Sequence, residues 1–234
     1  MSYTIYPVGE RALAVQWGEG VDEPTNEVIL GITELVREAK IPGVTDLIPA
    51  YQTLTLVYDP VSVRKSTGAS SAYDWVYGEL RLLLEDLREL PRAPVRTVEI
   101  PVCYDPSFGP DQATICRDRG LTPESLIGLH ARVEYKVYMI GFLPGFAYMG
   151  LVDERIAAPR KREPVLHIPA GSVGIAGIQT GVYPVPSPGG WNIIGRTPVT
   201  LFDPMAADPV LLRAGDRVRF VPITLDAYHG YTSH

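Results

Sequence analysis

The first hundred residues alternate between two patterns of apolar side chains. The segments that carry a strand pattern are residues 12–17, 44–48, 53–58 and 95–102. Residues 24–39 repeat their apolar positions at helical spacing, with Asp22 available as a cap. A second helical stripe opens at Ser70, runs through Leu87 and ends at Pro91. This order predicts a ferredoxin-like β-α-β-β-α-β domain.

After Tyr104 the pattern changes. Two short helices are expected over residues 110–119 and 122–131. The expected strands that follow are residues 133–140, 172–185, 192–203 and 217–223. Their even spacing between turns predicts a closed barrel rather than an open sheet. We therefore expect an α+β protein, with an N-terminal domain over residues 1–103 and a β-barrel domain over residues 104–234.

Composition narrows the class of protein. The chain has 234 residues, 46% hydrophobic and 21% charged, which is an ordinary globular balance. A net charge of −6 argues against a nucleic-acid partner, since phosphate binding needs a basic face. No apolar run approaches the roughly 20 residues of a membrane span, and no signal peptide is evident. Cys103 and Cys116 are too few for a disulfide framework. We expect a reduced cytoplasmic protein that binds neither nucleic acid nor membrane.

Residues 141–198 combine ten glycines and eight prolines with short apolar runs. Disordered Gly/Pro-rich segments lack such apolar content, so this stretch is read as short strands joined by tight turns. The candidate site residues inside it are Ser172, Gln179, Trp191 and Arg196. This composition favours a built site over a linker.

Two residues near the end of that stretch suit ligand binding. Arg196 follows Gly195, and an arginine in a glycine-rich turn suits bidentate capture of a carboxylate or phosphate. An ordinary strand-edge salt bridge is the alternative. Trp191 follows Gly189 and Gly190, where it either presents an aromatic face to a ligand or fills the barrel core. The sequence leaves both alternatives open.

Other chemistry is less specific. Ser172 lies in a segment that resembles a nucleophile elbow, but the residues after it are strand-like rather than helical. A serine that binds a ligand or a turn is therefore favoured over a nucleophile. His130 ends a predicted helix just before the first barrel strand, which fits either a structural or a catalytic role. No phosphate loop, dinucleotide fingerprint or metal-ligand motif is present, so no metal site is expected.

Several long blocks together resemble one known family, the KipI / allophanate hydrolase subunit 1 family. They are FGPD (108–111), LH (129–130), YKVYMIGFLPGFAYMG (135–150), PAGSVGIAGIQTGVYP (169–184) and SPGGWNIIGRTP (187–198). The blocks are ordered and span nearly the whole chain. The resemblance implies an N-terminal α/β domain followed by a cyclophilin-like β-barrel.

One position departs from the family pattern. Members commonly read PR…PR…PAGS, and here Pro159-Arg160 is kept while Val165 follows Pro164. If the second arginine normally binds an anion, Arg160 or Arg162 must take that role here.

The resemblance also implies a function. Family members form one part, the B-type subunit, of a three-component ATP-dependent 5-oxoprolinase, which opens the lactam of 5-oxo-L-proline to L-glutamate. The implied partners are a C-type subunit, of the KipA / allophanate hydrolase subunit 2 kind, and an A-type subunit, of the LamB/YcsF kind. ATP, with or without Mg²⁺, is the expected cofactor of the complex, and no covalent cofactor is expected. The alternatives are an inhibitor of a sensor histidine kinase and a carboxyltransferase-like subunit that acts with a biotin-dependent partner.

Lactam opening assigns roles to these residues. Phosphorylation of the carbonyl oxygen by ATP makes the lactam a better electrophile, so the site needs anion donors and backbone N–H groups. We expect Arg196 and His130 to be catalytic, while Gln179 reads the lactam amide and the two glycine turns donate N–H groups. The expected substrate-binding residues are Gly171, Ser172, Gln179, Gly189, Gly190, Trp191 and Arg160. The chain alone is expected to have little activity, because it supplies only part of a shared site.

Overall fold

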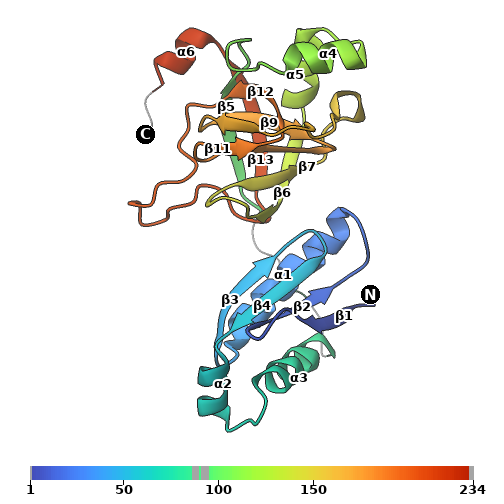
Figure 1. Ribbon diagram of the computed structural model, residues 1–234, viewed down its shortest axis with the longest axis vertical. Coiled ribbons are helices and arrows are strands. Elements are labelled where there is room, and N and C mark those ends of the chain that lie inside the picture. The colour runs from blue at the N-terminus through green and yellow to red at the C-terminus, as the bar shows by residue number, and fades with distance from the viewer. Residues whose placement is uncertain (1, 86–89, 91–94, 232–234) are drawn as a thin grey trace. The chain divides into compact units, whose positions relative to one another are not determined.

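The computed structural model describes residues 2–85, 90 and 95–231. Contacts divide the chain into two units, Met1–Pro94 and Val95–His234 (Figure 1). Each unit has a hydrophobic core of its own. Each unit is therefore described by itself.

The N-terminal unit is built on an antiparallel sheet with the strand order β1-β2-β4-β3. Its strands are β1 (Thr4–Pro7), β2 (Ala12–Gln16), β3 (Val44–Pro49) and β4 (Thr53–Tyr58). Helix α1 (Glu23–Ala39) links β2 to β3, and β4 lies between those two strands. This is a split β-α-β arrangement. Leu54, Leu56 and Tyr58 alternate along β4 as its buried face.

The helices of this unit bury apolar stripes in the same core as that face. The Asp22 carboxylate accepts a hydrogen bond from the Thr25 backbone N–H (2.8 Å), which caps α1 as expected. Helix α3 (Ala72–Glu85) contributes Val76 and Leu80 to the core. Leu87 and Pro91, where this helix was expected to end, lie outside the described residues. Helix α2 (Pro60–Thr67) was not predicted.

The strand expected to complete the ferredoxin-like sheet belongs to the other unit. Strand β5 (Thr97–Cys103) pairs with β13 (Arg217–Ile223) and β12 (Asn192–Arg196), and β1 takes the sheet position beside β2. Ile100 and Val102 of β5 are fully buried in the core of the second unit, which is the physical reason for this pairing. The ferredoxin-like order is thus not confirmed, and contacts divide the chain after Pro94 rather than after Cys103.

The second unit is a closed barrel, as expected, with the strand order β10-β7-β6-β13-β5-β12-β9. The strands not yet given are β6 (Glu134–Ile140), β7 (Ala147–Gly150), β9 (Ser172–Ala176) and β10 (Gln179–Val182). Strands β5 and β13 are parallel and pair from Thr97↔Arg217 to Cys103↔Ile223. Strands β8 (Val165–Ile168) and β11 (Ser187–Gly189) form a separate two-stranded ribbon.

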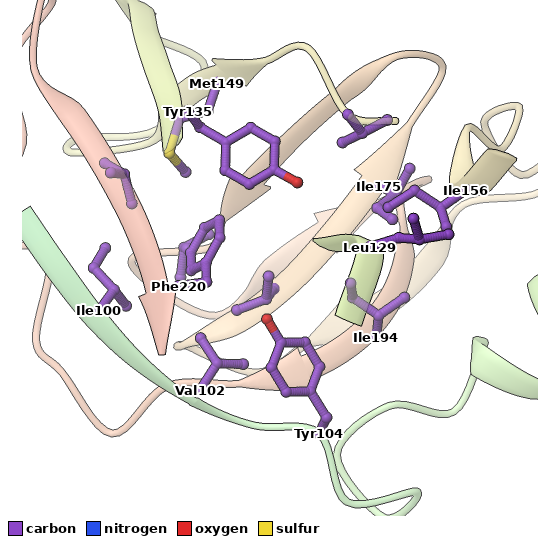
Figure 2. Packing of buried hydrophobic residues seen from close by; sticks show 14 of the residues in the cluster. Ile100, Val102, Tyr104, Leu129, Tyr135, Met149, Ile156, Ile175, Ile194 and Phe220 are labelled. Atoms are coloured by element: carbon purple, nitrogen blue, oxygen red, sulfur yellow. The ribbon is translucent and has the colours of Figure 1, made fainter. Parts of the chain in front are cut away.

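Apolar side chains from facing strands fill the barrel (Figure 2). Helices α4 (Gln112–Arg119) and α5 (Pro123–Ala131) lie close to their expected positions, and a 3₁₀ turn, η1 (Glu154–Ile156), follows β7. Leu129 of α5 and Ile156 of η1 belong to the same core cluster.

Two of the expected barrel strands are shorter than predicted. The segment expected as one strand over residues 172–185 turns at Gly177, which has a positive φ of 61°, and so forms β9 and β10. The strand expected over residues 192–203 ends at Arg196 as β12. A short helix, α6 (Leu225–His229), was not predicted. Among the described residues, no helix combines the length and apolarity that a membrane crossing requires.

Candidate functional site

Trp191 lies in a packed aromatic cluster rather than on an open surface. Its side chain is 2% exposed, and its ring meets Phe146 edge to face, with 5.3 Å between ring centroids. A Cβ on Gly181 would lie 3.2 Å from the Trp191 ring, and one on Gly174 would lie 3.1 Å from the Trp191 Cβ. These glycines make room for the ring. Of the two alternatives, the structure favours the packing role.

The Gly189-Gly190 turn serves the same cluster. A Cβ on Gly189 would lie 2.2 Å from the Tyr183 hydroxyl oxygen, which accepts a hydrogen bond from the Trp191 backbone N–H. The Gly190 carbonyl accepts a hydrogen bond from the Lys161 backbone N–H at 2.8 Å. Much of the glycine content of this stretch thus serves close packing.

Arg160 is exposed on a segment that is fixed on both sides. The Asn192 side-chain amide donates to the Pro159 carbonyl at 2.9 Å, and Lys161 pairs through Nζ with Asp111 at 2.7 Å. Burial raises the pKa of Tyr148, and the Arg160 charge partly offsets this rise. Arg160 forms no ion pair with any carboxylate among the described residues. Val165, the departure from the family pattern, is exposed at the start of β8.

Gln179 and Ser172 lie far apart along the β9–β10 pair. Gln179 begins β10 opposite Ala176, the last residue of β9, whereas Ser172 is its first residue. Arg196 pairs with Ser172, and Asn192, beside Trp191, pairs with Ile175. The sequence-predicted residues therefore do not all converge on one point.

His130 is enclosed in the barrel interior. Its Nδ1 accepts from the Tyr104 hydroxyl (2.8 Å), and its Nε2–H donates to Thr180 Oγ1 (2.9 Å). Thr180 Oγ1 in turn donates to the Gly174 carbonyl at 3.0 Å. Burial lowers the pKa of His130 to about 3, so the ring is neutral at physiological pH. Its side chain is 0% exposed, which favours a structural role over the catalytic role expected from the sequence.

Ser172 and Arg196 form the most unusual pair in the barrel unit. The two residues face each other across β9 and β12, and a register shift lies just before them on β12. Ser172 Oγ and Arg196 Nε are both buried, and neither has a hydrogen-bond partner. No other side-chain N or O atom of the barrel unit shares this condition within the part of the chain that the structure describes. Each unsatisfied polar group costs about 1–3 kcal/mol of stability, so the pair calls for an explanation.

Gly171 shapes this corner. It has a positive φ of 78°, and a Cβ there would lie 2.3 Å from the Thr197 carbonyl oxygen and 3.3 Å from Arg196 Cγ. The backbone N–H groups of Gly171 and Ser172 already donate to the Tyr183 and Pro169 carbonyls. The expectation that this turn offers free N–H groups to an oxyanion is therefore wrong.

Phe108 is the functional neighbour that sequence reasoning missed. The Arg196 guanidinium stacks on its ring, with Cζ 4.8 Å from the ring centroid. Gly109, next in the FGPD block, has no space for a Cβ, which would lie 2.5 Å from the Ile194 carbonyl oxygen. The Asp111 carboxylate accepts from the Ile193 backbone N–H at 2.7 Å. This block therefore fastens Phe108 against β12, and its presence among the blocks of the family signature was the available signal.

The candidate site is thus the Ser172–Arg196 corner with Gly171 and Phe108, and Arg160 offers a separate exposed cation. The Ser172–Arg196 corner suits an anion, because the guanidinium and the hydroxyl both supply hydrogen-bond donors. No group of three or more His, Cys, Asp or Glu side chains suited to a metal occurs among the described residues. Two surface cavities, of about 490 and 400 Å³, are lined by residues of the N-terminal unit and contain none of these side chains.

Comparison with known proteins places the chain. The family model described as the carboxyltransferase domain, subdomain C and D, matches residues 3–212. The chain is 45% identical to the B-type subunit of 5-oxoprolinase from Bacillus subtilis, over 98% of this chain and 96% of that protein. It is 39% identical to the protein of the same name from Escherichia coli O157:H7, over 93% and 94% of the two chains. The chain belongs to the family of 5-oxoprolinase B-type subunits. The resemblance inferred from the sequence blocks is confirmed.

Solved structures extend the comparison. TTHA0988 is 41% identical with a TM-score of 0.77, and the match covers 91% of this chain but only 40% of TTHA0988. The protein PH0987 from Pyrococcus horikoshii is 39% identical with a TM-score of 0.56, over 96% and 100% of the two chains. Urea amidolyase of K. lactis has a TM-score of 0.78 at 16% identity, over 97% of this chain and 15% of the enzyme, which shows a shared fold.

Proposed function

We propose that this chain acts as the B-type subunit of a multi-subunit 5-oxoprolinase, which opens 5-oxo-L-proline to L-glutamate with hydrolysis of ATP. The observation that carries the proposal is the likeness to the Bacillus subtilis protein, which covers 98% of this chain and 96% of that protein. The match therefore spans almost the whole of both sequences.

The residues of the candidate site fit electrostatic stabilisation better than nucleophilic attack. Ser172 Oγ contacts no base, and neutral His130 is hydrogen-bonded to Tyr104 and Thr180 instead. Arg196 supplies a fixed positive charge, which stabilises a ligand's negative charge in a partly buried site. In the proposed reaction, ATP phosphorylates the carbonyl oxygen and leaves as ADP. One water then attacks the carbonyl carbon, and the ring C–N bond breaks to give an acyl phosphate as the nitrogen takes up a proton. A second water hydrolyses the acyl phosphate to L-glutamate and phosphate.

ATP does not fit the Gly171-Ser172 turn of this chain. A phosphate cradle needs free backbone N–H groups, and those of Gly171 and Ser172 are donated within the fold. We propose that ATP binds elsewhere in the complex, and the C-type and A-type subunits expected from the family are the candidates. The match to less than half of TTHA0988 supports a unit that works joined to a further part.

Reconstitution tests the proposal. The chain is co-expressed with homologues of the C-type and A-type subunits, and glutamate release from 5-oxo-L-proline is measured with and without ATP. We expect ATP-dependent release from the assembled complex, and little or none when this chain is left out or is assayed alone. An assembled complex that releases no glutamate contradicts the proposal.

A carboxyltransferase-like role is the second candidate, because the matching family model carries that description. It requires a carboxybiotin donor on a separate carrier protein. Transfer of labelled carboxyl from such a carrier to urea, by a complex that leaves 5-oxo-L-proline intact, would favour it. Inhibition of a histidine kinase stays a prediction from the resemblance alone.

A further inference from the structure

We propose that Arg196 and Ser172 bind the carboxylate of a small organic acid. Given the proposed function, on which this identification rests, that acid is 5-oxo-L-proline. The starting observation is that Arg196 Nε and Ser172 Oγ are both buried without partners on paired positions of adjacent strands. Two unsatisfied donors on residues paired across adjacent strands call for an acceptor that the free chain does not supply.

The fold keeps its own acceptors away from this pair. Asp105 and Asp111 flank Phe108, the residue that contacts Arg196, at three residues on either side. Asp105 accepts from the backbone N–H of Ser107 (2.9 Å), whereas Asp111 pairs with Lys161 (2.7 Å). The group that meets Arg196 is the ring of Phe108, whose centroid lies 4.8 Å from Cζ, and the buried Nε has no hydrogen-bond partner.

The donors favour a carboxylate over a phosphate. Nε and one terminal nitrogen of a guanidinium lie along one edge, spaced for the two oxygens of a planar carboxylate, and the Ser172 hydroxyl adds a third donor. Phosphate sites in proteins usually add several backbone N–H groups. Here the N–H groups of Gly171 and Ser172 already donate to carbonyl oxygens.

Gly171 keeps the arginine in place for this role. Its φ is +78°, and a Cβ at this position would lie 2.3 Å from the Thr197 carbonyl oxygen and 3.3 Å from Arg196 Cγ, so another residue here would clash with the backbone and crowd the arginine stem. Ser172 is 0% exposed, so its hydroxyl lies within the packed corner rather than at the surface. The two donors are therefore held rigidly on neighbouring strands, as a preorganised site requires.

Access to the pair requires a small movement. Both atoms are enclosed, and Phe108, which stacks on Arg196, also contacts Tyr228 of α6 with 4.5 Å between ring centroids. Helix α6 has no buried residue, so little packing opposes its displacement. A carboxylate therefore enters as α6 and the Phe108 ring shift away from the guanidinium, while Gly109 and Asp111 keep the backbone of this block on β12.

Calorimetric titration of the full-length chain tests this inference with three probes: 5-oxo-L-proline, 2-pyrrolidinone (the same lactam ring without the carboxylate) and inorganic phosphate. We expect 5-oxo-L-proline to bind at least about tenfold more tightly than 2-pyrrolidinone, and phosphate not to compete with it. Arg196→Met should weaken binding at least about tenfold, and Arg117→Met, at an exposed position on α4, is the matched control.

Ser172→Ala separates a ligand role from a structural role. It should weaken binding several-fold, yet the midpoint of thermal unfolding should stay the same or rise by about 2–4 °C, because it removes an unpaired buried hydroxyl. A fall in that midpoint shows that the hydroxyl stabilises the fold and overturns the inference. Equal binding of the two lactams, or an Arg196→Met chain that binds like wild type, also overturns it.

The failure of this site can be told apart from the failure of the proposed function. A complex that turns over 5-oxo-L-proline but whose KM is unchanged by Arg196→Met and Ser172→Ala leaves the proposed function standing and removes this site. If instead the chain binds 5-oxo-L-proline through Arg196 but the assembled complex does not open the lactam, the site stands and the proposed function fails.

Discussion

The buried histidine of the barrel gives a quantitative test of the structure. Burial lowers the pKa of His130 to about 3 from an ordinary value of 6.5. Between these two pH values the unfolded chain binds a proton at this residue and the folded chain does not. Stability must therefore fall as the pH falls from 6.5 toward 3, and this contribution is fully present above 6.5.

The size of this effect follows from the pKa shift. At pH 5 the unfolded histidine is almost fully protonated while the folded ring stays neutral. Each pH unit below 6.5 then costs about 1.4 kcal/mol, so His130 alone lowers the free energy of unfolding by about 2 kcal/mol between pH 7.5 and pH 5. This is a large fraction of the stability of an ordinary domain.

Urea unfolding of wild type and His130→Gln at pH 7.5, 6 and 5 measures the effect. The variant should be less stable at pH 7.5, since it loses the ring that stacks on Phe220 at 4.7 Å. Its deficit relative to wild type should shrink by about 2 kcal/mol at pH 5, because glutamine does not titrate. His167→Gln, at an exposed position on β8, controls for the loss of a histidine as such.

A deficit that stays constant from pH 7.5 to pH 5 would refute the reasoning, because it would show that His130 titrates alike in both states. If His130→Gln does not fold, the ring carbon chemical shifts of wild-type His130 report its pKa directly. A shift midpoint near 6.5 in the folded protein would then refute it.

Two further perturbations test the packing of the barrel unit. Gly189→Ala should lower the free energy of unfolding by about 1–3 kcal/mol in a urea assay, since its Cβ would lie 2.2 Å from the Tyr183 hydroxyl. Gly128→Ala, with open space on α5, should instead raise that free energy by up to about 1 kcal/mol in the same assay. Asp216→Ala should cost about 1.5–3 kcal/mol, because the nearly buried carboxylate accepts hydrogen bonds from Arg96 and from the Arg213 backbone N–H. Asp118→Ala, in an exposed pair, should cost less than about 1 kcal/mol, and equal losses in the two aspartate variants would contradict the assignment.

Local patterns predicted the kinds of element well and their partners poorly. Residues 95–102 show a strand pattern, but nothing within them says that the partner is β13, more than a hundred residues later. Strand β1 was missed because a four-residue segment ending at Pro7 carries too little periodicity. Helix α2 had a usable signal, since Asp59 caps it and Pro60 takes its first position.

The site shows the same division. Residue type and glycine context singled out Ser172 and Arg196, and the structure makes them cross-strand neighbours. That pairing depends on a register shift between Ile193 and Gly195, which no local pattern reveals. Trp191 and His130 were ambiguous for a different reason: a polar or aromatic side chain is a ligand contact or a core residue according to which distant segments surround it.

The parallel pairing of β5 with β13 also bears on how the chain folds during synthesis. These strands open and close the barrel, so the barrel sheet cannot close before Ile223 has been made and has left the ribosome. The N-terminal unit has all its strands within the first 58 residues and can fold much earlier. Until β13 has been synthesised, the apolar face of β5 remains without that partner strand. The chain is therefore most exposed to aggregation, and most in need of chaperones, during the final stage of its synthesis.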